Sequence, residues 1–316
     1  MGCAPMPQSA SDRPDDGGPA GGHSLFVSAQ DGLRLHVRAH GARTNRALPV
    51  ICLPGLARTT ADFDTLAVAL ASDRERPRRV LALDYRGRGK SDYDRKPANY
   101  NLQVELADVL SVLTALGIGR AAFVGTSRGG ILIMLLAVAR PTAIAGCVLN
   151  DIGPVIDLEG LMRIKGYVGK LPALASFPAA AEALKRRFGS LFPKWSDDDW
   201  LAFARATFKE DGGRLVPDYD PKLATILEPI GPEQPLPALW KEFDALGRVP
   251  VMVIRGANSD ILSAATVEAM RKRRRALEVL EVPEEGHAPR LAGVLTIERI
   301  AGFIASCDAT GSGYRS

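Results

Sequence analysis

The chain has 316 residues and a formal net charge of +4 at pH 7, with 46% hydrophobic and 24% charged residues. These values are ordinary for a soluble enzyme and allow one large domain with a sizeable core, or two small domains. Dense basic runs occur only at residues 76–79 and 271–275, and the second coincides with a plausible helix whose solvated face it would form. We therefore expect no nucleic-acid partner.

The cysteines argue against a metal site and against a disulfide framework. The sequence contains no CxxC pair and no histidine at metal-ligand spacing from a cysteine. Two of the four cysteines lie in apolar runs, where a buried thiol acts as a small hydrophobic group. We expect a reducing compartment, no metal and no cofactor. The four cysteines are Cys3, Cys52, Cys147 and Cys307.

Residues 1–22 are rich in Pro, Gly, Ser and Asp and contain no apolar core of a signal peptide, so a disordered leader is expected. Residues 308–316 are expected to form a flexible tail. No segment reaches the ~20 consecutive apolar residues that a membrane-spanning helix needs. The sequence therefore predicts a cytoplasmic protein without a membrane partner.

Short apolar runs alternate with helical patterns along most of the chain. Residues 25–27 and 33–37 flank an Asp-Gly turn and predict an opening hairpin. Five further runs resemble buried parallel strands, each followed by a turn that bears Gly or Asp. Helices are expected at residues 102–116 and 131–138. This alternation predicts a mostly parallel sheet with helices on both faces. The five runs are residues 50–53, 80–83, 121–124, 147–149 and 251–254.

Residues 154–246 depart from this alternation of strands and helices, because they lack a buried-strand pattern and are rich in aromatic residues. We interpret them as a helical insertion that covers one edge of the sheet as a cap, with most aromatic side chains packing its core. The predicted core domain then comprises residues 23–153 and 247–307.

A Gly-Thr-Ser-Arg-Gly sequence at residues 125–129 stands between an apolar strand and an apolar helix. This G-x-S-x-G pattern is typical of a sharp strand-to-helix turn that exposes a nucleophilic serine. Its glycines are expected where side chains would collide with neighbouring strands. Ser127 is therefore the predicted nucleophile, and the alternative is an ordinary Gly-Ser turn.

A serine hydroxyl needs a general base, and the chain offers four histidines. Three of them lie in the leader, or in or just after the opening hairpin. His287 lies between Gly286 and Ala288 in a loop after the apolar run 277–282, which favours it as the base.

Two aspartates could orient that histidine. Where a serine follows this strand–turn–helix pattern, the acid stands between serine and histidine in the sequence and follows a strand. Asp260 follows the run 251–254, comes after the insertion and precedes His287 by 27 residues. Asp151 follows the run 147–149 and is the alternative acid. We expect Asp260 to take this position, with Asp151 as a turn or capping residue.

Backbone amides are the expected donors to an oxyanion. The amide of Arg128 opens the helix after the serine, and the Pro-Gly turn after residues 50–53 presents the amide of Leu56. A plain Pro-Gly turn is the alternative for the second position.

Taken together, these segments resemble the cap-bearing branch of the α/β-hydrolase superfamily, which includes esterases, lactonases and carbon–carbon bond hydrolases. The resemblance covers about residues 25–307 and includes a D-x-R-G-x-G-x-S loop at residues 84–91. It implies an α/β-hydrolase fold whose helical cap is inserted before the penultimate strand. Two departures stand out, because Leu53-Pro54-Gly55 replaces the frequent His-Gly and a charged Arg128 follows the nucleophile.

The expected function is that of a serine hydrolase that cleaves a carboxylic ester or lactone of a small, largely apolar substrate through an acyl-enzyme on Ser127. A serine nucleophile argues against relatives that attack with aspartate, such as epoxide hydrolases. A carbon–carbon bond or amide hydrolase with the same residues remains open, as does a non-catalytic small-molecule receptor. The sequence leaves the oligomeric state open.

Overall fold

A computed structural model of the chain describes residues 21–43, 47–233 and 236–309. The predicted leader therefore lies almost wholly outside the described residues, as do residues 310–316 of the predicted tail. The last helix extends past the boundary expected at residue 307. Within it, the Asp308 carboxylate forms an ion pair with Arg78, 2.6 Å from its Nη2.

An eight-stranded sheet forms the centre of the described chain, in the order β1-β2-β4-β3-β5-β6-β9-β10. β2 pairs antiparallel with β1 and with β4, and the remaining pairs are parallel. The opening hairpin and the predicted strands are present. The strands are β1 (His23–Ser28), β2 (Arg34–His40), β3 (Val50–Leu53), β4 (Val80–Asp84), β5 (Ala121–Thr126), β6 (Ile144–Asn150), β9 (Val251–Gly256) and β10 (Glu278–Val282).

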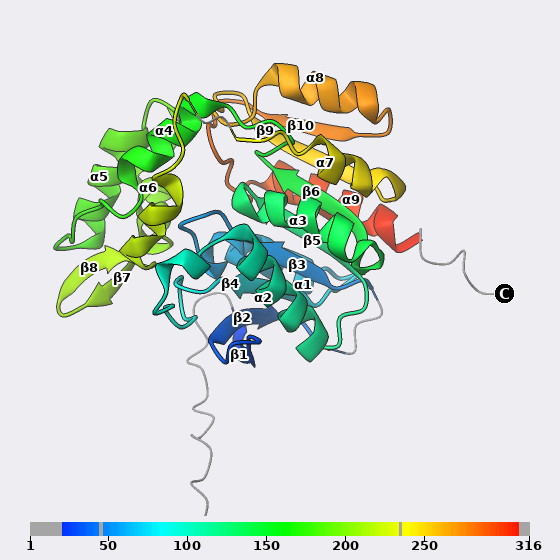
Figure 1. The fold of residues 1–316 in the computed structure, drawn as a ribbon, viewed down its shortest axis with the longest axis horizontal. Helices are drawn as coiled ribbons and strands as arrows, with labels where there is room; N and C mark the ends of the chain where they lie inside the picture. Colours follow the sequence, from blue (N-terminus) through cyan, green and yellow to red (C-terminus); the bar gives the residue numbers. More distant parts are fainter. Residues whose placement is uncertain (1–20, 44–46, 234–235, 310–316) are drawn as a thin grey trace, which may run out of the picture.

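Helices cover both faces of this sheet (Figure 1). On one face lie α2 (Leu102–Ala115), α3 (Arg128–Ala139), α7 (Trp240–Ala245) and α8 (Ala264–Arg273), and on the other lie α1 (Asp64–Ala71) and α9 (Val294–Ala309). Short 3₁₀ helices are η1 (Thr60–Phe63), η2 (Pro97–Asn99), η3 (Pro141–Ala143), η4 (Pro221–Leu227) and η5 (Leu246–Arg248).

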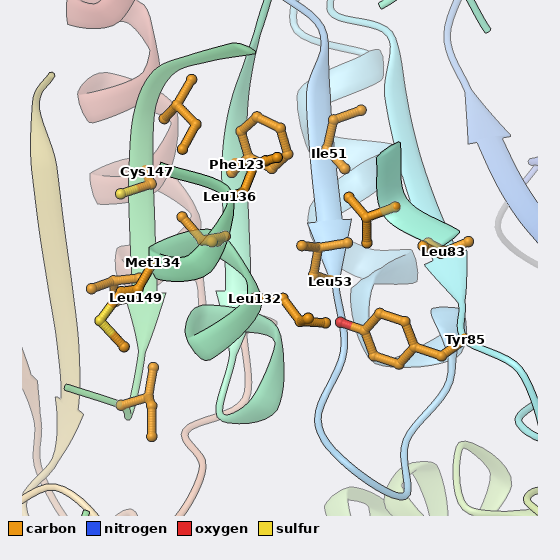
Figure 2. Packing of buried hydrophobic residues seen from close by; sticks show 14 of the residues in the cluster. Ile51, Leu53, Leu83, Tyr85, Phe123, Leu132, Met134, Leu136, Cys147 and Leu149 are labelled. Carbon is orange, nitrogen blue, oxygen red and sulfur yellow. The ribbon is translucent and has the colours of Figure 1, made fainter. Parts of the chain in front are cut away.

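The central strands read as continuous apolar runs because both of their faces are buried. In β3, Ile51 and Leu53 point into the cluster under α2 and α3, whereas Val50 and Cys52 point into the cluster under α1 and α9. Side chains of successive strand residues alternate between faces, so each run supplies two cores at once. Figure 2 shows Leu53 of β3 beside Leu132 of α3 in the first of these cores.

The helix predicted at residues 102–116 begins and ends close to its expected limits. Asn101 is its N-cap, and its side-chain oxygen accepts a hydrogen bond from the Val104 amide at 3.0 Å. This bond satisfies one of the backbone donors that the first turn leaves without an intrahelical partner.

Residues 154–246 differ in two ways from a purely helical insertion. They contain an antiparallel hairpin, and their last helix, α7, packs on α3 of the sheet layer through Phe243. A second group of elements lies to one side of the sheet (Figure 1), namely α4 (Leu158–Tyr167), α5 (Phe177–Phe188), α6 (Asp197–Arg205), β7 (Phe208–Asp211) and β8 (Arg214–Pro217). α5, α6, β7 and β8 share a separate apolar cluster that includes Phe188 and Trp200, and α4 packs against it through Tyr167. Ile164 of α4 and Leu223 of η4 belong instead to the cluster under α2 and α3.

Candidate active site

Ser127 lies in the sharp turn between β5 and α3, as its sequence context predicts. Its φ is 51° and its ψ is −114°, a left-handed conformation that costs a residue with a Cβ of order 1–3 kcal/mol. The turn is held in place because the Ser127 amide donates to the Asn150 carbonyl at 2.9 Å and the Ser127 carbonyl accepts from the Gly130 amide at 2.9 Å.

Two glycines permit this turn through close approach rather than through an unusual φ. A Cβ at Gly129 would lie 2.0 Å from the carbonyl oxygen of Leu53, and a Cβ at Gly125 would lie 2.6 Å from the backbone carbon of Gly129. Real Cβ atoms do not approach backbone so closely. The motif glycines are therefore required by packing of the turn against β3 and α3.

His287 joins Ser127 to an aspartate. Its Nε2 lies 2.9 Å from Ser127 Oγ, and its Nδ1 lies 2.8 Å from Asp151 Oδ2. The loop that carries the histidine is tied to the sheet because Asn150 Nδ2 donates to the Pro289 carbonyl at 3.0 Å. Serine, histidine and aspartate thus form a continuous hydrogen-bonded relay of the kind that activates a serine hydroxyl.

The aspartate in this relay is Asp151 and not Asp260, so the structure corrects the expected acid. Asp151 follows β6, the strand next to β5, and its backbone φ of 55° is left-handed. Its buried carboxylate also accepts hydrogen bonds from the Gly256 amide at 2.8 Å and from Ser259 Oγ at 2.5 Å. These bonds fix the carboxylate toward His287, in the position for which the sequence analysis gave Asp151 as the alternative acid.

Asp260 instead connects the sheet edge to the insertion. Its carboxylate accepts a hydrogen bond from Arg163 Nη2 of α4 at 2.8 Å, and its carbonyl accepts from the Gly160 amide at 3.0 Å. Burial by itself raises the pKa of Asp260, but the Arg163 guanidinium outweighs burial and lowers the pKa below its ordinary value. Asp260 is therefore a charged anchor for α4.

Replacing Asp260 by asparagine is expected to reduce stability in a pH-dependent way. Because the folded-state pKa lies below the ordinary 3.8, the carboxylate stabilises the fold above about pH 4, and this stabilisation is lost as the pH falls through the folded-state pKa. The loss at pH 7 should be roughly 1–2 kcal/mol. Urea unfolding of wild type and Asp260→Asn between pH 3 and pH 8 measures it.

The matched control is Asp244→Asn, which removes an exposed carboxylate paired with Arg273. An exposed pair contributes little, so this variant should stay close to wild type at every pH. A stability difference for Asp260→Asn that does not shrink in acid would contradict the ion-pair account.

Leu56 and Arg128, whose amides are the predicted oxyanion donors, both lie next to Ser127. Leu56 and Ser127 line the same cavity, and Arg128 is the first residue of α3. Among the described residues, neither amide donates to a backbone or side-chain acceptor. Two such free amides beside the serine, one of them at the N-terminus of α3, suit the stabilisation of negative charge.

A buried carboxylate links the chain segments that carry these two amides. Glu105 of α2 lies 2.5 Å from Arg128 Nε and 2.8 Å from Arg88 Nη1, and Arg88 Nε donates to the Leu56 carbonyl at 2.8 Å. Burial alone would raise the pKa of Glu105, but the guanidinium groups of Arg128 and Arg88 outweigh it and lower the pKa. The positive charge of Arg128, next to the predicted nucleophile, is thus compensated by the Glu105 carboxylate.

The sequence did not single out Glu105, Arg88 or Ser259. Glu105 sits at a helical position that otherwise reads as part of an amphipathic pattern, and its burial only becomes visible in the folded chain. For Arg88, the only sequence signal was its position in the D-x-R-G-x-G-x-S loop at residues 84–91.

A cavity of about 270 Å³ lies beside Ser127 and His287, and we call it the histidine-side cavity. Both the sheet edge and residues of the insertion line it. Its walls include two cations that are already paired: Arg58 Nε donates to Asp62 at 2.8 Å, and Arg290 Nη2 lies 2.5 Å from Asp199. Aromatic side chains from the insertion complete the wall, namely Tyr167, Phe188, Phe192, Trp195, Phe203 and Tyr219.

No group of three or more His, Cys, Asp or Glu side chains among the described residues is arranged to hold a metal ion. Within the same residues, no helix is long and apolar enough to cross a membrane.

A family model described as the alpha/beta hydrolase family matches residues 50–297. The chain belongs to the alpha/beta hydrolase family. The matched range contains the serine turn, both aspartates and His287. The fold class predicted from the sequence is therefore confirmed, with its mostly parallel sheet and flanking helices.

Similar proteins include several hydrolases. A 3-hydroxybutyrate-oligomer hydrolase of Cupriavidus necator is 32% identical over 273 residues, which cover 84% of this chain and 91% of the relative. A 2-(acetamidomethylene)succinate hydrolase of Mesorhizobium japonicum is 26% identical over 79% of this chain and 85% of the relative. A crystal structure of an alpha/beta hydrolase from Novosphingobium aromaticivorans has 41% identity and a TM-score of 0.83, and covers 90% of this chain and 98% of that one.

These alpha/beta hydrolase relatives support the prediction that the chain is a hydrolase acting on a small molecule. The names of the two curated relatives state different substrates, so membership of the family leaves the substrate class to be argued from the site.

Proposed function

We propose that this protein is a serine hydrolase that cleaves a carboxylic ester through an acyl-enzyme on Ser127. The observation that carries the proposal is the relay in which His287 Nε2 lies 2.9 Å from Ser127 Oγ while its Nδ1 lies 2.8 Å from Asp151. In this proposal Ser127 is the nucleophile, His287 the general base and Asp151 the acid that orients the histidine.

In the first half of the reaction, His287 Nε2 accepts the proton of Ser127 as Oγ attacks the ester carbonyl carbon. The carbonyl oxygen gains the negative charge, and the amides of Leu56 and Arg128 donate hydrogen bonds to it. The tetrahedral intermediate then collapses, the carbon–oxygen bond to the alcohol breaks, and His287 gives its proton to the departing alcohol oxygen.

In the second half, a water molecule takes the place of the alcohol. His287 accepts a proton from this water as its oxygen attacks the acyl carbon, and the same amides hold the second oxyanion. Collapse releases the carboxylic acid and returns the proton to Ser127. Asp151, with its bonds to Gly256 and Ser259, keeps Nδ1 protonated and Nε2 free to act as the base.

The insertion acts as a cap in this proposal, because its side chains form much of the wall of the histidine-side cavity. A largely apolar wall with paired cations suits a small substrate without a large net charge. The Cupriavidus necator relative, which is named for 3-hydroxybutyrate oligomers, makes short hydroxyalkanoate esters a rational part of the substrate panel. The cytoplasmic location stays a prediction.

The proposal is tested with p-nitrophenyl esters from acetate to laurate and with 3-hydroxybutyrate oligomers, each assayed with wild type and Ser127→Ala. A fluorophosphonate probe followed by mass spectrometry reports the labelled residue. We expect ester turnover and a single adduct on Ser127 in wild type, and neither in the variant. Turnover that survives in Ser127→Ala would refute a covalent mechanism on this serine.

A second candidate is an amide hydrolase with the same residues, which is suggested by the Mesorhizobium japonicum relative because the substrate in its name carries an acetamido group. Matched ester and amide pairs that share one acyl group separate the two functions. Carbon–carbon bond cleavage is tested in parallel with vinylogous diketones. A protein that takes up no probe and turns over none of these substrates, yet binds a small molecule saturably, would instead be a receptor.

A further inference from the structure

Ser127 lies in the wall of a second cavity, which has a volume of about 300 Å³ and which we call the isoleucine cavity. It shares only Leu56, Ser127 and Ile164 with the histidine-side cavity. Its remaining wall comes from α2 and the two residues before it, from α3, from the segment directly after β6, from the insertion and from the loop after β9. Six isoleucines belong to this cavity alone, namely Ile131, Ile152, Ile156, Ile226, Ile230 and Ile261.

The two cavities differ in their relation to the histidine. His287 lines the histidine-side cavity together with Pro289 and Arg290, and it does not line the isoleucine cavity. Arg128, whose amide is a proposed oxyanion donor, lines only the isoleucine cavity. Ser127 therefore lies between one cavity that His287 lines and a second cavity that His287 does not line.

Because only one cavity is lined by His287, the alcohol and the acyl group of an ester can be assigned to different cavities. The leaving alcohol must take its proton from His287, and the water that replaces it must give its proton to His287. Both events require the space on the histidine side of Ser127. The acyl group, which stays bonded to Oγ between these events, must occupy the other side. Resting on the function proposed above, we propose that the isoleucine cavity binds the acyl chain and the histidine-side cavity binds the leaving alcohol.

The walls specify the kind of acyl chain. Among the described lining residues of the isoleucine cavity, only Arg128 carries a charge, and its guanidinium is paired with buried Glu105. A charged acyl group would lose its hydration there without finding a free partner. The acyl group is therefore an uncharged aliphatic chain.

The experiment uses two ester series and two variants. In the first series the acyl chain grows from acetyl to lauroyl on constant p-nitrophenol, and in the second the alcohol grows from ethanol to decanol on constant acetate. Ile226→Phe narrows the isoleucine cavity from the η4 segment, and Ala202→Phe narrows the histidine-side cavity from α6. Both residues lie in the insertion and away from the serine turn, so the two variants are matched.

We expect Ile226→Phe to shift the acyl optimum to shorter chains and to lower kcat/KM for the longest accepted acyl chain at least tenfold, while the alcohol series changes less than twofold. Ala202→Phe should do the reverse. A response of the alcohol series to Ile226→Phe, or no response of either series, would overturn the assignment.

A turnover-free measurement separates failure of this assignment from failure of the ester function. Alkylphosphonofluoridates lose fluoride as they label Ser127, so the labelling rate against alkyl length reports the acyl side alone. One possible outcome is that no ester is hydrolysed but Ile226→Phe still slows labelling by long-chain probes at least tenfold. The proposed ester function would then be refuted, and the assignment of the acyl chain to the isoleucine cavity would be supported. Equal labelling rates in wild type and Ile226→Phe would overturn the assignment even in an active esterase.

Discussion

Replacing Ser127 by glycine is expected to abolish turnover and, at the same time, to make the protein more stable. Loss of the nucleophile removes the covalent pathway, which costs about a million-fold in kcat in an enzyme that relies on a serine triad. The left-handed backbone of Ser127, with φ at 51°, is strained with a Cβ and relaxed in glycine. After subtracting the greater flexibility of glycine in the unfolded chain, about 1 kcal/mol of stability should remain.

Steady-state kinetics and thermal unfolding of the same preparations check both halves of this prediction. Ser127→Ala is the control, because it removes Oγ but keeps the Cβ in the strained conformation. It should lose activity to the same extent without the gain of a few degrees in Tm expected for glycine. Equal melting temperatures for the two variants would show that the turn stores no strain at this residue.

Replacing Asp151 by asparagine should lower kcat about ten-thousand-fold while the fold stays intact. An asparagine amide at this position would face His287 Nδ1 and favour the tautomer that carries its proton on Nε2, where the proton of Ser127 must be accepted. Asparagine tolerates the left-handed φ of 55° at residue 151. The lost activity should therefore not reflect unfolding.

Asp260→Asn is the discriminating control for this experiment, since both aspartates follow strands at the same sheet edge. We expect it to retain kcat within a few-fold of wild type, with the acid-dependent stability change described above. Measurement of kcat/KM from pH 5 to pH 9 for both variants shows which of the two aspartates is needed for catalysis. A larger loss in Asp260→Asn than in Asp151→Asn would restore the acid assignment made from the sequence.

Features of the fold whose cause is local could be predicted from the amino-acid sequence. Strands buried on both faces had to be continuous apolar runs, so their positions were readable. The serine turn could be predicted because its glycines stand at fixed offsets from Ser127 and it lies between a short apolar run and a longer apolar segment. His287 was identifiable because the other histidines lie in the expected leader, or in or just after the opening hairpin.

Which of the two aspartates contacts His287 depends on the three-dimensional fold. Each follows a strand whose carboxyl end lies at the same edge, so sequence spacing could not rank them. The sheet order places β6 directly beside β5, which brings Asp151 next to Ser127, while Arg163 of the insertion neutralises Asp260. Two further features could not be predicted from the sequence for the same reason. The ion pair between Arg128 and Glu105 and the two cavities on either side of Ser127 depend on contacts between segments distant in the sequence. No local sequence pattern encodes such contacts.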